Sequence, residues 1–97
     1  MRHSIDDYLN AARARLSLDS DRALDRALEF RSTSVSFYRR KKALPSETVM
    51  INLAILAGVD PALALIDLAM WRAEARQDGH ALTVWQRLHD MVSETMV

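Results

Sequence analysis

The chain has 97 residues, no cysteine, and only two glycines and two prolines. The absence of cysteine excludes a disulfide framework and any thiolate zinc site. Few glycines and prolines mean few helix breakers, and the abundant alanine, leucine and arginine favour helix. No segment shows the alternation of β-branched and polar residues that is typical of a strand. The composition therefore predicts an all-α fold.

Long apolar runs are missing as well. No segment approaches the ~18 consecutive apolar residues of a membrane span. The N-terminal sequence MRHSIDDYL lacks the apolar core of a signal peptide. We therefore expect a cytoplasmic protein with no membrane segment, and the length suits one helical domain over residues 1–97.

The usual signatures of catalysis and metal binding are also absent. His3, His80 and His89 lack metal-ligand spacing, and we expect all three on the surface. No glycine-rich phosphate loop and no nucleophile elbow is present. We expect no enzyme, no metal or cofactor, and no small-molecule ligand.

Apolar periodicity and capping signals divide the chain into five to six helices. Ser4 is a plausible N-cap, Asp60-Pro61 combines an N-cap with a proline in the first helical position, and Gly58 is a C-cap. The expected ranges are about 5–16, 20–29, 32–41, 46–57, 61–76 and 81–96.

Residues 20–42 have the pattern of two short helices joined by a tight turn. Leu24 and Leu28 lie on one face of the first helix, and Val35 and Tyr38 form one inward edge of the second. Hydroxyl side chains that lie between these inward positions reach base edges, whereas cations suit phosphates. This layout predicts a helix-turn-helix with the recognition helix second.

The charge is zero overall but unevenly distributed. Residues 1–44 hold ten Lys/Arg and six Asp/Glu, whereas residues 45–97 hold three and seven. The range 31–42 contains five cations and no anion. Local potential decides where a polyanion docks, so this end of the chain favours nucleic acid. A solvated helix end is the alternative interpretation of the run Arg39 to Lys42.

The fourth and fifth helices are apolar on more than one side, so both sides need cover. The last helix supplies part of it. The rest of the cover comes either from the same chain or from a second subunit. In the second case we expect a dimer built mainly from residues 50–97, with the helices over 62–97 as the dimerisation region. The candidate dimer anchors are Ile51, Ile55, Trp71 and Trp85.

The sequence resembles the phage-repressor (Cro/CI-like) helix-turn-helix superfamily. Leu24, Leu28, Phe30, Val35 and Tyr38 occupy the apolar positions of its motif, and LPSETVMINLAILAGVDP (44–61) is similar to its fourth helix. More narrowly, Tyr8-Leu9, RAEAR (72–76) and WQRL (85–88) resemble motifs of short phage- and prophage-encoded regulatory proteins. The resemblance implies a Cro/CI-like core with a C-terminal helical extension, and a transcriptional regulator that binds double-stranded operator DNA as a homodimer.

The resemblance also implies the DNA-binding residues. Arg31, Ser32, Thr33, Ser36, Phe37 and Arg40 fall where such proteins touch bases or adjacent phosphates, and Arg39, Lys41 and Lys42 are expected on phosphates. The same positions lie on faces that Val35 and Tyr38 leave free. An exposed Phe37 would pack on a thymine methyl group; the alternative is a core residue in a shifted register.

Three positions depart from the superfamily pattern. Asp25 stands where alanine is usual, and Glu29 stands where glycine is usual because that residue tends toward the left-handed region. Arg31 stands where Ser or Thr caps the recognition helix, so we expect Ser32 to be the cap. Asp25 and Glu29 near the basic helix, together with the acidic second half of the chain, keep a second hypothesis open, a small phage protein that binds a host protein and has a vestigial DNA surface.

Overall fold

The computed structural model describes residues 3–30 and 34–95, which form six α-helices and no strand. The expected all-α fold is thereby confirmed. The helices are α1 (Ile5–Leu16), α2 (Asp21–Ala27), α3 (Ser34–Arg39), α4 (Glu47–Ala57), α5 (Pro61–Ala75) and α6 (Gly79–Thr95).

Short-range capping explains why these helices begin and end where they do. Ser4 and Asp7 form a reciprocal capping box at the start of α1. The side chains of Ser46 and Asp60 accept backbone N–H groups in the first turns of α4 and α5. Gly58 ends α4 with a φ of 76°, in the left-handed region that glycine adopts at little cost.

Three helix ends differ by two residues from the expected ranges. α2 ends at Ala27 and not at Glu29, because Glu29 has a φ of 62° and its N–H bonds to the carbonyl of Arg26. α3 ends at Arg39, two residues early, because Lys41 has a φ of 58° and its N–H bonds to the carbonyl of Tyr38. α6 begins at Gly79, two residues early, because the carboxylate of Asp78 accepts the N–H of Ala81 at 3.0 Å. These differences come from turn hydrogen bonds and not from the apolar periodicity.

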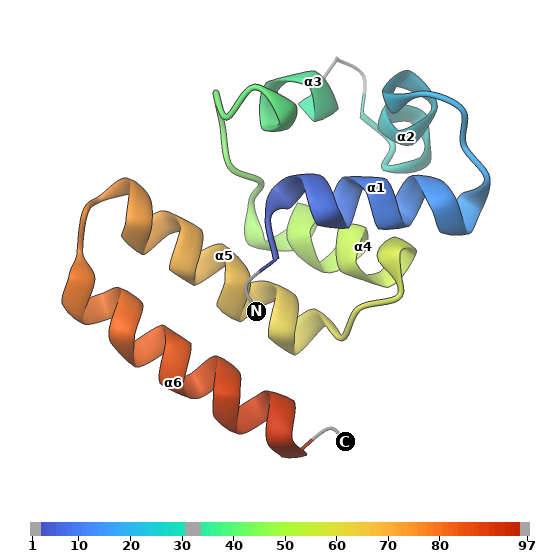
Figure 1. The fold of residues 1–97 in the computed structure, drawn as a ribbon. Coiled ribbons are helices and arrows are strands. Elements are labelled where there is room, and N and C mark those ends of the chain that lie inside the picture. The colour runs from blue at the N-terminus through green and yellow to red at the C-terminus, as the bar shows by residue number, and fades with distance from the viewer. Residues whose placement is uncertain (1–2, 31–33, 96–97) are drawn as a thin grey trace.

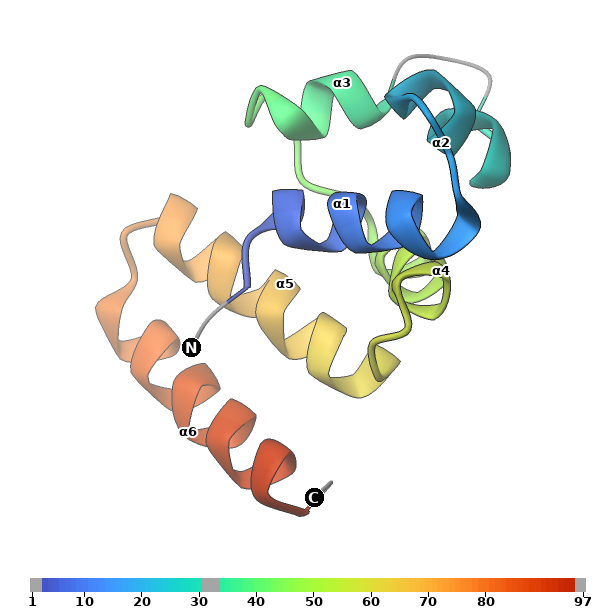
Figure 2. The same ribbon diagram turned by 45° about the vertical axis from the view of Figure 1, so that its right-hand side comes forward.

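The helices are arranged around α1. In Figures 1 and 2, α1 lies between the α2–α3 pair on one side and α4 with α5 on the other. α6 lies at the opposite extreme from α2 and α3, and within the described chain it packs along α5 alone. None of the helices formed by residues 3–30 and 34–95 is long and apolar enough to cross a lipid bilayer.

One hydrophobic core joins α1 to α5. Leu9, Leu24 and Leu53 are fully buried at its centre, and Met50 and Met70 are also inaccessible. Most of α5 is covered within the chain, by α4 and by Tyr8 of α1 on one side and by α6 on the other. Leu65, Ile66 and Ala69 of α5 remain partly exposed.

A buried polar network connects α1, α5 and α6. The hydroxyl of Tyr8 donates a hydrogen bond to Oδ2 of Asp67, and Nε2 of His89 lies 3.4 Å from Oδ1 of the same carboxylate. Asp67 is fully buried, and the side chain of His89 is only 12% exposed. The expectation that His89 is a surface residue is therefore wrong. Burial, together with the hydrogen bond and charge of Asp67, raises the pKa of Tyr8.

Candidate nucleic-acid interface

The α2–α3 unit is held on α1 by the apolar frame that the sequence predicts. Leu24 and Val35 are fully buried, and Tyr38 is nearly so. Phe30 packs against this core and meets the ring of Tyr38 edge-on, with 6.3 Å between ring centroids. The inward positions of the motif are thus confirmed, and the opposite side of α3 is left exposed.

Asp25 links α2 to α3 directly. Its side chain is buried, and Oδ1 accepts the backbone N–H of Val35 at 2.9 Å. This N–H lies in the first turn of α3, where it has no partner within the helix. Asp25 therefore contributes a cap to α3 from the position where the resemblance implies alanine. Burial and the nearby charge of Asp25 both raise the pKa of Tyr38.

Glu29 adopts the left-handed conformation that its position implies, with a φ of 62°. The N–H of Glu29 bonds to the carbonyl of Arg26, and the next N–H, of Phe30, bonds to that of Asp25. These two bonds end α2 and turn the chain toward α3. A residue with a Cβ in this region costs on the order of 1 kcal/mol.

We expect Glu29→Gly to raise the free energy of unfolding by about 0.5–1 kcal/mol, because glycine removes the left-handed strain. Urea denaturation followed by circular dichroism measures the change. Glu29→Ala is the matched control, since it also removes the carboxylate but keeps the Cβ. Equal stability changes in the two variants would show that the conformation is not the cause.

Arg39 does not face outward as expected. Its guanidinium lies 3.1 Å from Oδ1 of Asp6 and 3.1 Å from Oδ1 of Asp21, and its side chain is 22% exposed. Burial acts to lower the pKa of Arg39, but the hydrogen bonds and charges of Asp21 and Asp6 outweigh it and raise the pKa. Arg39 ties α3 to α1 and α2, so we remove it from the candidate phosphate-binding residues.

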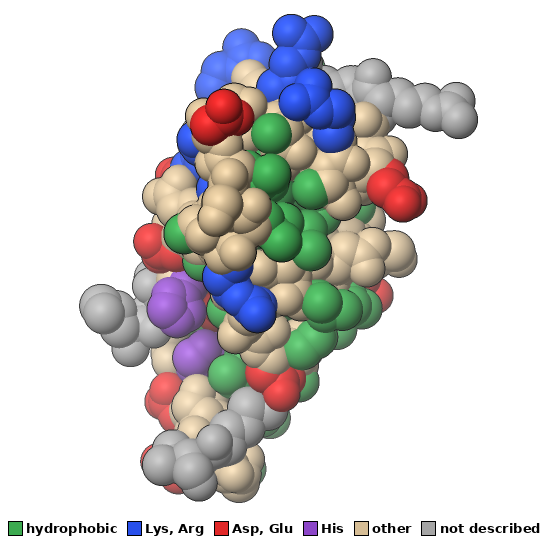
Figure 3. All heavy atoms as spheres, turned by 90° about the vertical axis from the view of Figure 1, so that its right-hand side faces the viewer, with side chains coloured by type: hydrophobic (Ala, Val, Ile, Leu, Met, Phe, Trp, Pro, Cys, Tyr) green, Lys and Arg blue, Asp and Glu red, His purple; other side chains and the backbone are tan. Residues whose placement is uncertain are grey.

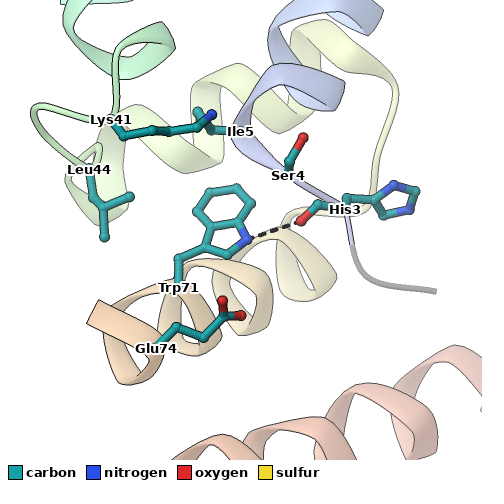
Figure 4. Close-up of a pocket in the computed structure, with 7 residues that line it drawn as sticks. All are labelled: His3, Ser4, Ile5, Lys41, Leu44, Trp71 and Glu74. Atoms are coloured by element: carbon teal, nitrogen blue, oxygen red, sulfur yellow. Dashed lines mark hydrogen bonds between the residues drawn. The ribbon is translucent and has the colours of Figure 1, made fainter. Parts of the chain in front are cut away.

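Lys41 is also tied back to α1. Its Nζ lies 2.9 Å from Oδ2 of Asp6, and the hydrogen bond to Lys41 is the largest cause that lowers the pKa of Asp6. Figure 4 shows Lys41 extending toward the start of α1 across an open pocket of about 360 Å³ that is also lined by Leu44 and Trp71. Lys41 is therefore less available to phosphate than the neighbouring Lys42.

The exposed side of α3 retains an aromatic ring, and two exposed cations follow at its C-terminal end. Phe37 is 44% exposed, which agrees with the outward register and not with a core position. The guanidinium of Arg40 lies 5.2 Å from the centroid of its ring. Within residues 3–30 and 34–95, neither Arg40 nor Lys42 makes an ion pair. Ser36 is partly exposed beside them.

Two further cations extend this surface onto α2. Arg22 and Arg26 are exposed and, in the described part of the chain, unpaired. Most Lys and Arg side chains visible in Figure 3 gather at the end of the molecule formed by α2 and α3. Sequence reasoning missed these two arginines, although their spacing of i and i+4 places them on one side of the helix.

The remaining predicted residues fall into two groups. Arg31, Ser32 and Thr33 lie outside the described residues. Of the candidate dimer anchors, Ile55 is 56% exposed, whereas Ile51 and Trp85 are partly buried. Trp71 packs edge-on against Tyr8 and donates its indole N–H to the carbonyl of His3 at 3.0 Å. Because these contacts hold Trp71 within its own chain, it is a poor dimer anchor.

No group of three or more His, Asp or Glu side chains gathers as a metal site would in residues 3–30 and 34–95. Comparison of the chain with models of protein families, with curated proteins and with solved structures found no match. The geometry of the α2–α3 surface is therefore the main ground for a functional proposal.

Proposed function

We propose that this protein is a sequence-specific DNA-binding transcriptional regulator of the phage or prophage type. The observation that carries the proposal is the exposed side of α3 and the turn that follows it, which are anchored from behind. Phe37 is exposed there, and among residues 3–30 and 34–95 neither Arg40 nor Lys42 makes an ion pair. The resemblance of residues 20–42 to a Cro/CI-like helix-turn-helix supports it. The protein is then a binding protein and not an enzyme.

In this proposal α3 enters the major groove. Ser36 and Phe37 lie at base edges. The hydroxyl of Ser36 forms a hydrogen bond with a donor or an acceptor on a base, and the ring of Phe37 packs on a thymine methyl group. Arg40 and Lys42 bind phosphates, and Arg22 and Arg26 add contacts to the backbone from α2. The Asp25 cap and the Arg39 ion pairs hold α3 in place before binding, which reduces the ordering cost of recognition.

A single unit of this kind reads few base pairs, so we propose that the protein acts as a homodimer on a two-fold symmetric operator. It would act in the bacterial cytoplasm, associated with the nucleoid when bound. Because phosphate contacts dominate affinity, binding should weaken steeply with salt.

A gel shift against the DNA upstream of its own gene tests the proposal. We expect a specific complex at low salt that disappears as salt rises, and we expect Ser36→Ala to change the preferred sequence at one position by about 1–3 kcal/mol at most. A Ser93→Ala variant, far along α6, is the matched control and should bind as the wild type does. Absence of any complex at low salt would refute the DNA proposal.

The alternative is a small phage protein that binds a host protein. The observation in its favour is an open hollow between α2 and α4, lined by Leu28, Ile55 and Leu56 together with the polar side chains of Glu29 and Asn52. Ile55 is the most exposed isoleucine of the described chain. If DNA binding fails at low salt, this hollow becomes the first surface to test with host-cell proteins.

A further inference from the structure

The outer side of α6 carries a row of apolar side chains that nothing in the described chain covers. Val84, Leu88 and Met91 are 54%, 38% and 58% exposed. Their spacing of i, i+4 and i+7 places them on one side of the helix. The side that packs on α5 is a different one, where Trp85 and His89 are partly buried. The apolar face of α6 is therefore wider than α5 can cover.

This row continues into a groove between α5 and α6. The groove has a volume of about 410 Å³ and is lined by Leu65, Ile66 and Ala69 from α5 and by Trp85 from α6, together with the charged side chains of Glu47, Arg72 and Arg76. Trp85 lies three residues before Leu88, so the groove and the exposed row adjoin along α6. Together they make one mainly apolar surface that spans both helices, which we call the hairpin face.

The charges beside the hairpin face are arranged for self-association. Arg87 and Glu94 lie two turns apart on α6, on the same side and next to the apolar row. Within residues 3–30 and 34–95 neither makes an ion pair. A second α6 in antiparallel orientation brings Arg87 of each copy toward Glu94 of the other, whereas a parallel orientation brings like charges together.

We propose that the hairpin face is the interface of a homodimer, in which two α5–α6 hairpins pack with their α6 helices antiparallel to form a four-helix bundle. Two copies of the same surface meet, so each apolar row covers the other. α6 lies on the far side of α5 from α2 and α3 (Figures 1 and 2), so this dimer leaves both α3 helices exposed. The inference deepens the proposed homodimer, but the pairing itself is independent of DNA.

The experiment is sedimentation equilibrium of the full-length protein at about 50 µM without DNA, a concentration at which micromolar dimers are populated. We expect the wild type to be a dimer and Leu88→Glu to be a monomer with unchanged helix content. Ile55→Glu is the matched control, because it places the same charge on an exposed apolar position of α4; it should remain a dimer.

Charge reversal tests the orientation. Arg87→Glu and Glu94→Arg should each raise the dimer dissociation constant by about threefold to tenfold, since each creates two like-charge contacts per dimer. The double variant R87E/E94R should return to the wild-type value. A monomeric wild type, dissociation by Ile55→Glu but not by Leu88→Glu, or failure of the double variant to recover would each overturn the proposal. A stable dimer that does not bind DNA would defeat the proposed function alone.

Discussion

Tyr8→Phe should reduce the free energy of unfolding by about 3 kcal/mol, although it removes a single oxygen atom. The hydroxyl of Tyr8 donates to the carboxylate of Asp67, which has no exposure to solvent. A buried charged group that loses a hydrogen-bond donor keeps its desolvation penalty without the compensating bond. For a chain of this size, a loss of 3 kcal/mol corresponds to a fall in melting temperature of more than about 10 °C.

Tyr38→Phe is the matched control for this prediction. Tyr38 is also buried, but its hydroxyl makes no hydrogen bond among residues 3–30 and 34–95. We expect removal of the Tyr38 hydroxyl to reduce the free energy of unfolding by less than about 1 kcal/mol, because this hydroxyl does not pair within the described part of the protein. Denaturation by urea and by heat, with both variants compared to the wild type, measures the difference.

A double-mutant cycle identifies the partner. Asp67→Asn keeps an oxygen acceptor but removes the charge, so Tyr8→Phe should cost less in the Asp67→Asn background than in the wild type. We expect a coupling free energy of about 1–3 kcal/mol between the two positions, which is the range for groups in one buried network. Additive effects would contradict the network, even if each single variant were unstable.

Lys42→Ala should weaken binding to every DNA sequence alike, and more strongly than Lys41→Ala. Both substitutions remove one positive charge from adjacent positions, but Lys41 is bound to Asp6 at 2.9 Å. Lys42 is exposed and, in the described part of the chain, has no carboxylate partner. A hydrogen bond to a charged phosphate is worth about 1.5–3 kcal/mol, or about tenfold to a hundredfold in affinity.

The salt dependence distinguishes phosphate contact from a general effect of charge. Lys42→Ala should reduce the slope of log affinity against log salt by about one, and Lys41→Ala by clearly less. Asp6→Asn releases Lys41, whereas Arg39 keeps its ion pair with Asp21, so the variant should raise affinity at low salt. Asp19→Asn makes the same change of net charge on an exposed residue and is its control. Equal slopes for the two lysine variants would contradict the role assigned to Asp6.

Helix positions followed from local signals because their causes lie within one or two turns of the chain. The reciprocal bonds of Ser4 and Asp7 and the Asp60-Pro61 pair determine where α1 and α5 begin, whatever packs against them. The inward positions of α2 and α3 also followed from periodicity, because an apolar side chain at a repeated angle must meet the core. Glu29 does not belong to this group, because the local pattern placed it in the helix and only the resemblance implied its left-handed φ.

The assignment of cations on α3 could not be predicted from the sequence. Arg39 and Arg40 are adjacent and chemically identical, yet the 100° turn between them points Arg39 toward Asp6 and Asp21 and leaves Arg40 outside. Asp6 lies 33 residues before Arg39 in the chain. A pairing over that distance exists only after α1 and α3 have packed, so no local spacing indicates it.

The sequence alone therefore determined the helical class, most helix ends and the inward face of the α2–α3 unit, because these depend on neighbours along the chain. Only the tertiary structure decided which charged groups form ion pairs with one another and which remain exposed. It buried Asp67 with Tyr8 and His89, turned Asp25 into a cap for α3, and left the row on α6 uncovered. The physical reason is that desolvation and ion pairing depend on distances between helices, which periodicity within one helix does not contain.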